Sequence, residues 1–435
     1  MEKIDMITAS FEGTALSGTI RVPGDKSISH RAVMLGAIAK GTTTISGFLQ
    51  GEDCLSTIQI FSQLGVNIER SGTNVTVESP GIDGWKNPEV ALDAGNSGTT
   101  ARLLLGILAG STVTAEITGD RYLCKRPMRR VTTPLTEMGA EFKSDHQTGT
   151  LPLTVKGTPL KAMSYDMPIA SAQVKSAILF AGFSAKGTTV VTEKAASRDH
   201  TERMLQQFGA EVQSEVNTVS IVGGQSLQAC DVKVPGDISS AAFFMCAAAM
   251  VSGSTITFTD VGLNPTRTGI IDVLKEMGAK VSIKQKVEGE GEPYGELTVE
   301  SSDLHAVEIS GALIPRLIDE LPVIALLATQ ATGTTVIKDA EELRVKETDR
   351  IEAVCSELQK LGASIEPTPD GMRITGPTQL KGATLSSHGD HRLGMMAAIA
   401  SVVTDGPVQI EDASCINVSY PGFFEHLNLL SQTKH

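Results

Sequence analysis

The sequence predicts an α/β protein of two domains, each made of three copies of one small folding unit. Three observations predict this class. The chain has 435 residues, an apolar helix followed by a glycine and a strand returns six times, and a second helix–glycine–strand pattern falls inside those repeats. At about 150 residues per domain the length allows two or three domains. The repeat is longer than a solenoid repeat, so each copy should be a small fold of its own.

The first pattern is a helix rich in small apolar residues, then a glycine, then a strand of Thr, Val and Ile. Its glycines recur at intervals of 66 to 80 residues and are Gly41, Gly110, Gly187, Gly253, Gly333 and Gly406. Six such units divide most simply into two domains of three.

The second pattern places a glycine where another helix should end. It reads LGVNI, MGAEF, FGAEV, MGAKV and LGASI, with Gly65, Gly139, Gly209, Gly278 and Gly362. Glycine adopts the left-handed conformation without steric cost, which suits the end of a helix. Each of these glycines therefore predicts a helix end and a following strand.

Two nearly identical strings mark where the chain should pass between the domains. They are Val22-Pro23-Gly24-Asp25 and Val234-Pro235-Gly236-Asp237. We expect residues 23–236 to form the domain of units one to three. Residues 1–22 and 237–435 should form the other domain, with the active site in the cleft between the two.

Charge and composition exclude several classes of protein. The net charge of −13 argues against a general binder of nucleic acid or anionic membranes. No apolar run approaches the ~18 residues that span a bilayer, and the first residues lack the apolar core of a secretory signal. The six cysteines are scattered without a CxxC pair, which is typical of reduced thiols. We therefore expect a cytoplasmic protein and, because a cleft between its own domains would supply the site without a partner, a monomer.

The most charged stretch is Arg344–Arg350, with the sequence RVKETDR. It follows a strand-like run at residues 334–337, and it should open an amphipathic helix through Ile351, Val354, Leu358 and Leu361. In that helix Lys346 and Arg350 would share a face, and Glu347 would pair with Arg350. A solvated, salt-bridged helix start is the alternative interpretation.

Other predicted helix starts also carry cations or small hydroxyl residues. They lie at residues 25–31, 95–102, 171–176, 236–240, 319–322 and 389–392. Helix capping explains many of their Ser, Asp and Asn residues. It does not explain the cations Lys26, Arg31, Arg102 and Arg392, which favour a cleft that binds more than one phosphate or carboxylate.

Two further cationic stretches, residues 124–130 and 197–203, fit the same cleft or an exposed charged surface.

Three carboxylates are candidates for proton transfer. Partial burial could tune the pKa of Asp319; Glu347 is the second candidate; Asp390 is better explained as a helix cap or a partner of Arg392. His388 and His391 lack a third metal ligand at a useful spacing, so no metal is expected.

Seven strings together resemble the 5-enolpyruvylshikimate-3-phosphate synthase family over nearly the whole chain. They are DKSISHR, GNSGTTAR, KRPM, SAQVKS, RDHTER, RVKETDR and GDHR. The resemblance implies an inside-out α/β barrel fold, with three βαββαβ units around a pseudo-threefold axis in each domain. It also implies transfer of the enolpyruvyl group of phosphoenolpyruvate to the 5-hydroxyl of shikimate-3-phosphate, in the biosynthesis of aromatic amino acids. That addition–elimination passes through a tetrahedral ketal and uses neither cofactor nor metal.

The resemblance also assigns the site residues. Those for shikimate-3-phosphate are Lys26, Ser27, Arg31, Ser171, Ala172, Gln173, Arg198, Asp319 and Lys346. Those for phosphoenolpyruvate are Lys26, Gly98, Thr99, Arg126, Gln173, Glu347, Arg350, His391 and Arg392. Lys26, Asp319 and Glu347 would be catalytic, with Asp319 as the base and Glu347 as the proton donor, although the division between the two carboxylates is open.

The chain departs from the family pattern at two places. Val418 stands where many relatives have a lysine, so one contact to phosphoenolpyruvate is absent or supplied by another residue, and Ala172 replaces a second serine.

Two other functions remain open. Cys124 suits the related enolpyruvyl transferase that acts on UDP-N-acetylglucosamine, and the repeats alone would also suit a non-catalytic anion-binding scaffold.

Overall fold

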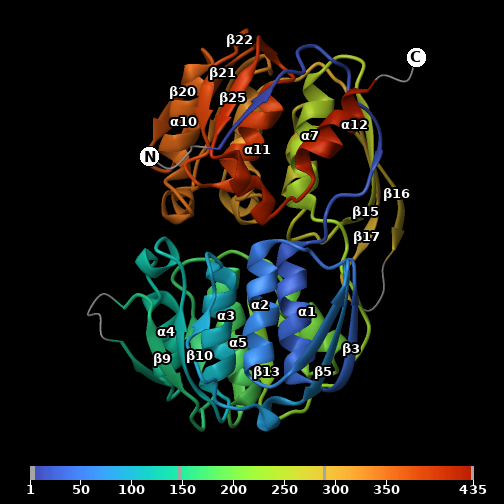
Figure 1. Cartoon of the computed structure of the whole chain (residues 1–435). Helices are drawn as coiled ribbons and strands as arrows, with labels where there is room; N and C mark the ends of the chain where they lie inside the picture. Colours follow the sequence, from blue (N-terminus) through green and yellow to red (C-terminus); the bar gives the residue numbers. More distant parts are fainter. Residues whose placement is uncertain (1–4, 145–148, 288–290, 433–435) are drawn as a thin grey trace. The chain divides into compact units, whose positions relative to one another are not determined.

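The structure is a computed structural model that describes residues 5–144, 149–287 and 291–432 (Figure 1). The chain divides into two compact units. The first unit contains Gly24–Val234 and Glu292, and the second contains the chain up to Pro23 and most of the chain from Pro235 onward. From the sequence, the chain was expected to pass between the two domains after residue 22 and again after residue 236. An additional excursion, which the repeats did not predict, carries Glu292 into the first unit.

The predicted apolar helices are confirmed, and they form the centre of each unit. They are buried almost all round, because a helix without a polar face cannot lie on a surface. In the second unit α7, α9 and α11 contact one another, and in the first α3 packs on α1 and α5. In the described residues these helices are α1 (Lys26–Ile38), α3 (Gly98–Ala109), α5 (Ala172–Ser184), α7 (Ile238–Met250), α9 (Leu321–Ala328) and α11 (His391–Ala400).

Sheets flank these helices, as Figure 1 shows for the first unit. One sheet of that unit has the order β14 (Val232–Lys233), β3 (Lys40–Ser46), β5 (Asn74–Pro80) and β4 (Asn67–Ser71). The next has β6 (Leu92–Asp93), β7 (Thr114–Thr118), β9 (Leu153–Lys156) and β8 (Glu141–Lys143). Another has β10 (Ser164–Asp166), β11 (Thr188–Thr192), β13 (Thr218–Val222) and β12 (Val212–Glu215).

The second unit repeats this arrangement. Its sheets have the orders β16 (Lys280–Val287), β17 (Tyr294–Glu300), β15 (Thr255–Gly262), β2 (Ser17–Ile20) and β18 (Glu308–Ile309), β19 (Gly333–Ile337), β21 (Gly371–Gly376), β20 (Ser364–Thr368). The remaining strands are β1 (Met6–Ala9), β25 (Val408–Glu411) and β23 (Thr384–Ser386), with β22 (Leu380–Lys381) beside β24 (Thr404–Asp405). In each four-stranded sheet, the strand that follows the apolar helix pairs parallel on one side and antiparallel on the other.

The second helix of each repeat also ends as predicted. Gly65, Gly139, Gly209, Gly278 and Gly362 have φ between 86° and 103°, and a strand follows each one. A side chain at such a φ is strained, so glycine decides where these helices stop. The helices that end at these glycines are α2 (Glu52–Gln63), α4 (Arg129–Glu137), α6 (His200–Gln207), α8 (Gly269–Glu276) and α10 (Arg350–Lys360). The last helix of the described chain, α12 (Phe423–Ser431), is followed by Gln432 and was not part of this prediction.

The prediction that residues 344–350 begin a helix is wrong about where that helix starts. Arg344 lies in a 3-10 turn (Glu341–Val345), and α10 begins only at Arg350. The reason is Asp349, which has an extended backbone and whose carboxylate accepts the N–H groups of Ile351 and Glu352. Lys346 therefore precedes the helix and does not share a helical face with Arg350.

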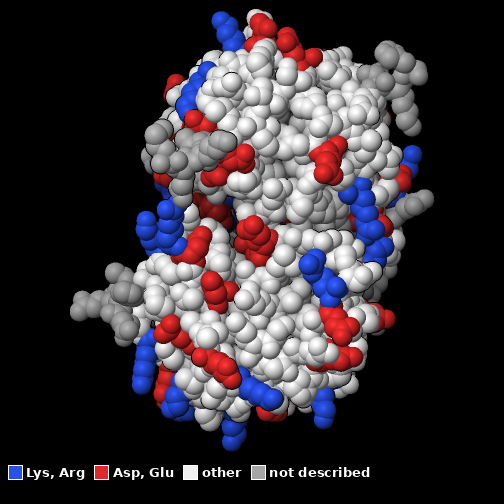
Figure 2. All heavy atoms as spheres, in the orientation of Figure 1, with Lys and Arg blue, Asp and Glu red and all other residues white. Residues whose placement is uncertain are grey.

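The distribution of surface charge and the state of the cysteines match what the composition led us to expect. On the face drawn in Figure 2, basic and acidic side chains are interspersed rather than gathered into one basic surface. The cysteines at positions 54, 124, 230, 246, 355 and 415 are all free thiols. Within the residues that the structure describes, no helix combines the length and the apolar character of a membrane span.

Candidate anion-binding and acid–base sites

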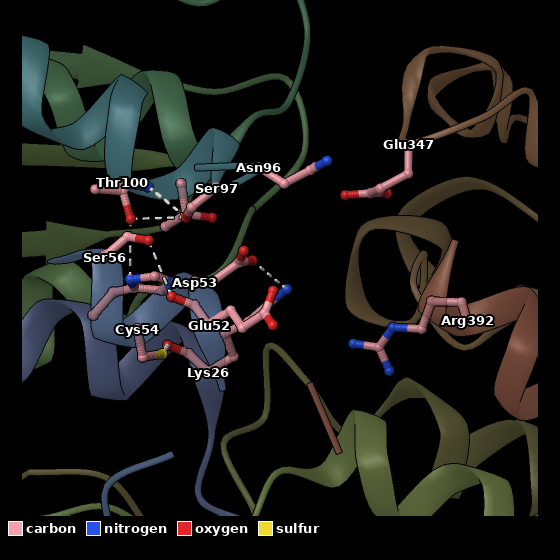
Figure 3. Close-up of polar contacts among 12 residues, drawn as sticks. Lys26, Glu52, Asp53, Cys54, Ser56, Asn96, Ser97, Thr100, Glu347 and Arg392 are labelled. Atoms are coloured by element: carbon pink, nitrogen blue, oxygen red, sulfur yellow. Dashed lines mark hydrogen bonds and ion pairs between the residues drawn. The ribbon is translucent and has the colours of Figure 1, made fainter. Parts of the chain in front are cut away.

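The start of α1 brings a lysine and a carboxylate together. Asp25 caps the helix by accepting the N–H of Ile28 at 2.9 Å. The Lys26 ammonium donates to the carboxylate of Asp53, in the first turn of α2, at 3.1 Å (Figure 3). Both side chains remain partly exposed. Lys26 is therefore a held but accessible cation at a helix N-terminus, where an anion is favoured.

Arg31, one turn further along α1, is a buried cation held by neutral oxygens. Its guanidinium donates to the hydroxyls of Thr201 (2.6 Å) and Ser176 (2.8 Å) and to the carbonyl of Ser27 (3.0 Å). Burial lowers the pKa of Arg31 to about 10, and the carboxylate of Glu202 opposes that shift. Arg31 is charged at neutral pH, and its hydrogen bonds go to groups that do not neutralise it.

Glycine at position 98 lets two arginine side chains lie close to the start of α3. A Cβ on Gly98 would lie 2.8 Å from Nη1 of Arg102 and 3.2 Å from Nη1 of Arg126. The guanidinium of Arg126 donates to the side chain of Asn96 at 2.6 Å. Ser97 caps the helix by accepting the N–H of Thr100 at 3.1 Å. Two guanidinium groups thus converge on this helix N-terminus.

Gln173 connects α5 to the start of α3. Its amide oxygen accepts from Arg102 at 2.8 Å, and its amide nitrogen donates to the hydroxyl of Thr99 at 3.1 Å. Ser171 caps α5 through the N–H of Val174, and Ala172 is the first residue of the helix. The predicted residues at the starts of α3 and α5 therefore form one connected group.

A buried network that the sequence did not predict lies behind these helix starts. Nδ1 of His30 is 2.8 Å from the hydroxyl of Thr57, which is 2.8 Å from the hydroxyl of Thr100. Thr100 in turn donates to the hydroxyl of Ser97 at 2.7 Å (Figure 3). Burial, and then the charges of Lys26 and Arg31, lower the pKa of His30 well below 6.5. A neutral histidine therefore joins α1, α2 and α3.

The start of α6 adjoins a buried ion cluster. Lys175 binds Glu202 at 2.7 Å and Glu193 at 2.8 Å. Burial lowers the pKa of Lys175, but attraction to Glu202 and Glu193 outweighs this effect and raises it. Arg198 lies partly exposed in the loop before α6. The loop that carries Arg198, a predicted site residue, thus lies next to this buried ion cluster.

In the second unit, Arg350 is surrounded by carboxylates. Its guanidinium donates to Asp390 (2.8 and 3.2 Å), to Asp319 (3.1 Å) and to Glu347 (2.7 Å). Burial alone would lower the pKa of Arg350, but the three carboxylates, led by Asp390, raise it. The predicted pairing of Glu347 with Arg350 is confirmed. Lys346 lies 3.8 Å from the carboxylate of Asp319.

Exposure separates the three carboxylates on Arg350. Asp390 is 0% exposed, whereas Asp319 is 17% and Glu347 is 26% exposed. Asp390 also accepts the backbone N–H of Arg392 at 2.8 Å and so caps α11, as predicted. Its ion pair is with Arg350, and its contact with Arg392 is made through the backbone. Only Asp319 and Glu347 remain accessible for proton transfer.

The first residues of α11 are buried. The guanidinium of Arg392 donates to the carbonyl of Ser239 at 3.1 Å and lies over the ring of Phe243. His391 is also buried. His388 instead bonds to Glu357 at 2.8 Å. Among the described residues no group of His, Cys, Asp and Glu could hold a metal ion.

Local contacts hold two further residues near positions that the sequence singled out. Tyr420, two residues after Val418, is buried and its hydroxyl is 2.7 Å from Nδ1 of His426. Cys124 lies half-buried, and its thiol donates to the carbonyl of Gly119 at 3.2 Å.

Sequence reasoning found the cations but missed their partners. Neither Asp53 beside Lys26, nor Thr201 and Ser176 beside Arg31, was singled out as a site residue. For Asp53 there was a signal, since two acidic residues in the first turn of a predicted helix favour a nearby cation. Thr201 and Ser176 are hydroxyl residues within named motifs, and only the fold brings them to Arg31.

Comparison with known proteins gives one consistent result. The family model described as EPSP synthase (3-phosphoshikimate 1-carboxyvinyltransferase) matches residues 11–427. A protein of Bacillus subtilis (strain 168) called 3-phosphoshikimate 1-carboxyvinyltransferase is 60% identical over 418 residues, 96% of this chain and 98% of that one. A protein of the same name from Shouchella clausii is 56% identical over 429 residues, 99% of each chain. A solved EPSP synthase from Acinetobacter baumannii matches with TM-score 0.89 and 43% identity over 98% of both chains.

Proposed function

The chain belongs to the EPSP synthase family, and we propose that it transfers the enolpyruvyl group of phosphoenolpyruvate to the 5-hydroxyl of shikimate-3-phosphate, with release of inorganic phosphate. The observation that carries the proposal beyond the family is the pair Asp319 and Glu347. Both are bound to the buried Arg350 and both stay partly exposed. Addition–elimination needs such a pair, one group for the hydroxyl proton and one for the methylene carbon.

The chemistry assigns a role to each carboxylate. In the addition, Asp319 takes the hydroxyl proton as the acceptor oxygen bonds to C2 of phosphoenolpyruvate, and Glu347 delivers a proton to C3. In the elimination, C3 returns a proton while the bond from C2 to the phosphate oxygen breaks. Arg350 contacts both carboxylates at once, with Nη1 donating to Asp319 and Nη2 donating to Glu347, a fixed planar arrangement that a lysine cannot reproduce.

The cations of the first unit support binding of the two phosphorylated substrates. Arg31 has neutral partners, which leaves its charge for an anion. We assign to shikimate-3-phosphate Lys26, Ser27, Arg31, Ser171, Ala172, Gln173 and Arg198, with Asp319 and Lys346 of the second unit. We assign to phosphoenolpyruvate Lys26, Gly98, Thr99, Arg126 and Gln173, with Glu347, Arg350, His391 and Arg392. Contacts of this kind accelerate the reaction when they tighten as charge redistributes in the transition state.

The finer architecture and the assembly are also proposals. The recurrence of apolar helix, glycine and strand supports three βαββαβ units around a pseudo-threefold axis in each unit. We further propose a monomer, which sedimentation velocity would test directly. A stable dimer at micromolar concentration would contradict it.

Phosphate release tests the proposed function most directly. The protein is incubated with phosphoenolpyruvate and either shikimate-3-phosphate or UDP-N-acetylglucosamine, and inorganic phosphate is measured. Release with shikimate-3-phosphate alone is expected. Release with UDP-N-acetylglucosamine alone would replace the acceptor and direct attention to Cys124, and no release from folded protein would favour an anion-binding scaffold.

A further inference from the structure

Glu292 occupies an unusual place in the chain. It lies between β16 and β17, which are strands of the second unit, yet it belongs to the first unit. There its carboxylate is 2.6 Å from Nδ1 of His200, and the two side chains are 3% and 1% exposed. This is a buried contact between residues 92 positions apart in the sequence.

Gly291 and Glu292 lie near side chains from the two ends of α6. His200 is the first residue of α6 and Gln207 is its last. Gly291, beside Glu292, has φ of 101°, and a Cβ at that position would lie 3.0 Å from the side-chain oxygen of Gln207. The chain therefore turns sharply at Gly291 and presents Glu292 to the start of the helix.

Successive residues of that helix start have different partners. His200 contacts Glu292, Thr201 accepts the Nε–H of Arg31 at 2.6 Å, and Glu202 binds Lys175 at 2.7 Å. Asp199, the residue that precedes the helix, makes no side-chain cap. The position of the Thr201 hydroxyl under Arg31 thus depends on how His200 and Glu202 are held.

We infer that Glu292 is a positioning residue for the acceptor-phosphate site. It fixes His200, and His200 fixes the start of α6, so that Thr201 orients the guanidinium of Arg31 toward the phosphate. The inference rests on the proposed function for the identity of the phosphorylated acceptor. Glu292 is thereby added to the proposed site as a residue that does not contact substrate. It also lies outside the recurring helix starts that the sequence pointed to.

Removing Glu292 has two opposed effects on anion binding. Loss of the hydrogen bond frees the start of α6 and weakens the site, whereas loss of a carboxylate near Arg31 strengthens its attraction for anions. Two variants separate these effects. Glu292→Gln keeps an oxygen that accepts from Nδ1–H of His200 but loses the charge, and Glu292→Ala loses both.

The test measures binding of shikimate-3-phosphate and of inorganic phosphate by calorimetry, and KM for each substrate. For Glu292→Ala we expect weaker binding of shikimate-3-phosphate by about 10-fold, the scale of one hydrogen bond to a charged group. KM for phosphoenolpyruvate should change less. Glu292→Gln should bind at least as tightly as the unmodified protein, because it keeps the hydrogen bond and loses the carboxylate charge near Arg31. Glu296→Ala, which removes a carboxylate from β17 of the second unit, is the matched control and should change nothing.

His200→Ala provides a second route to the same answer, because it removes the group that donates to Glu292 and should weaken acceptor binding similarly. Unchanged or tighter binding in Glu292→Ala, or equal losses in the Ala and Gln variants, would overturn the inference. If the unmodified protein binds phosphate but not shikimate-3-phosphate, the proposed acceptor is wrong, and the phosphate data still decide the role of Glu292. If it binds neither, both proposals fail.

Discussion

Asp390 gives the sharpest test of how the acid–base site is held together. Its carboxylate is fully buried, makes two contacts with Arg350 and caps α11. Asp390→Asn keeps the shape of the side chain and, because asparagine is as good an N-cap as aspartate, keeps the cap. The substitution therefore removes the negative charge that faces Arg350 and replaces the oxygen that accepts its Nε–H by an amide nitrogen, which cannot accept.

The magnitude follows from the partners that remain. Breaking a buried ion pair by removing one partner costs roughly 3–5 kcal/mol, because a charge is left uncompensated. Arg350 would keep Asp319 and Glu347, so its charge stays compensated. What is lost is one charge-assisted contact, worth about 1.5–3 kcal/mol. We expect the free energy of unfolding to fall by about 2 kcal/mol.

Asp349→Asn is the matched control. Asp349 also caps a helix and also pairs with an arginine, Arg344, but its side chain is 37% exposed. Exposed ion pairs contribute less than about 1 kcal/mol. The same chemical change should therefore cost much less at Asp349 than at Asp390.

Urea unfolding of the two variants, followed by fluorescence and circular dichroism, measures the difference. Equal losses in Asp390→Asn and Asp349→Asn would show that burial of the pair adds nothing to the capping role. A gain in stability for Asp390→Asn would show that Arg350 is surrounded by more negative charge than it needs. Either result would refute the reasoning.

Three more predictions concern activity and pH. Glu347→Gln should lower turnover by at least about 100-fold in the phosphate-release assay, and unchanged turnover would remove Glu347 from proton transfer. Gly98→Ala should raise KM for phosphoenolpyruvate about 10-fold, because its Cβ would displace Arg102 and Arg126; an unchanged KM would show that both side chains give way freely. His30 has a lowered pKa, so the unfolded chain takes up its proton first, and stability should be full above pH 6.5 and decline as the pH falls below it. His30→Gln should flatten that decline in urea unfolding at several pH values, and an identical pH dependence would contradict it.

The repeats were readable because their signals are local. A glycine with positive φ ends a helix through the backbone of its own turn, so Gly65 and its equivalents predicted helix ends that the structure confirms. Asp349 is just as local, but the string of charges before it resembled a first helical turn more than a cap. The excursion to Glu292 has no local signal at all, because it depends on a contact with His200 that only the folded chain provides.

The candidate site shows the same limit. The types of residue that hold anions and protons were visible in the motifs, since cations at helix starts stand out from ordinary capping residues. Their partners were not visible, because Lys26 and Asp53 are 27 positions apart and Arg31 and Thr201 are 170 apart. No periodicity in the sequence encodes such pairs.

The surroundings of Arg31 have a practical consequence for anyone who measures the stability of this protein. A buried guanidinium bonded to two hydroxyls and a carbonyl gains from any small anion that reaches it. An anion that binds only the folded chain raises the apparent stability in proportion to the logarithm of its concentration. Melting temperatures taken in phosphate or sulfate will therefore exceed those taken in an amine buffer with chloride, and comparisons between variants require a common buffer.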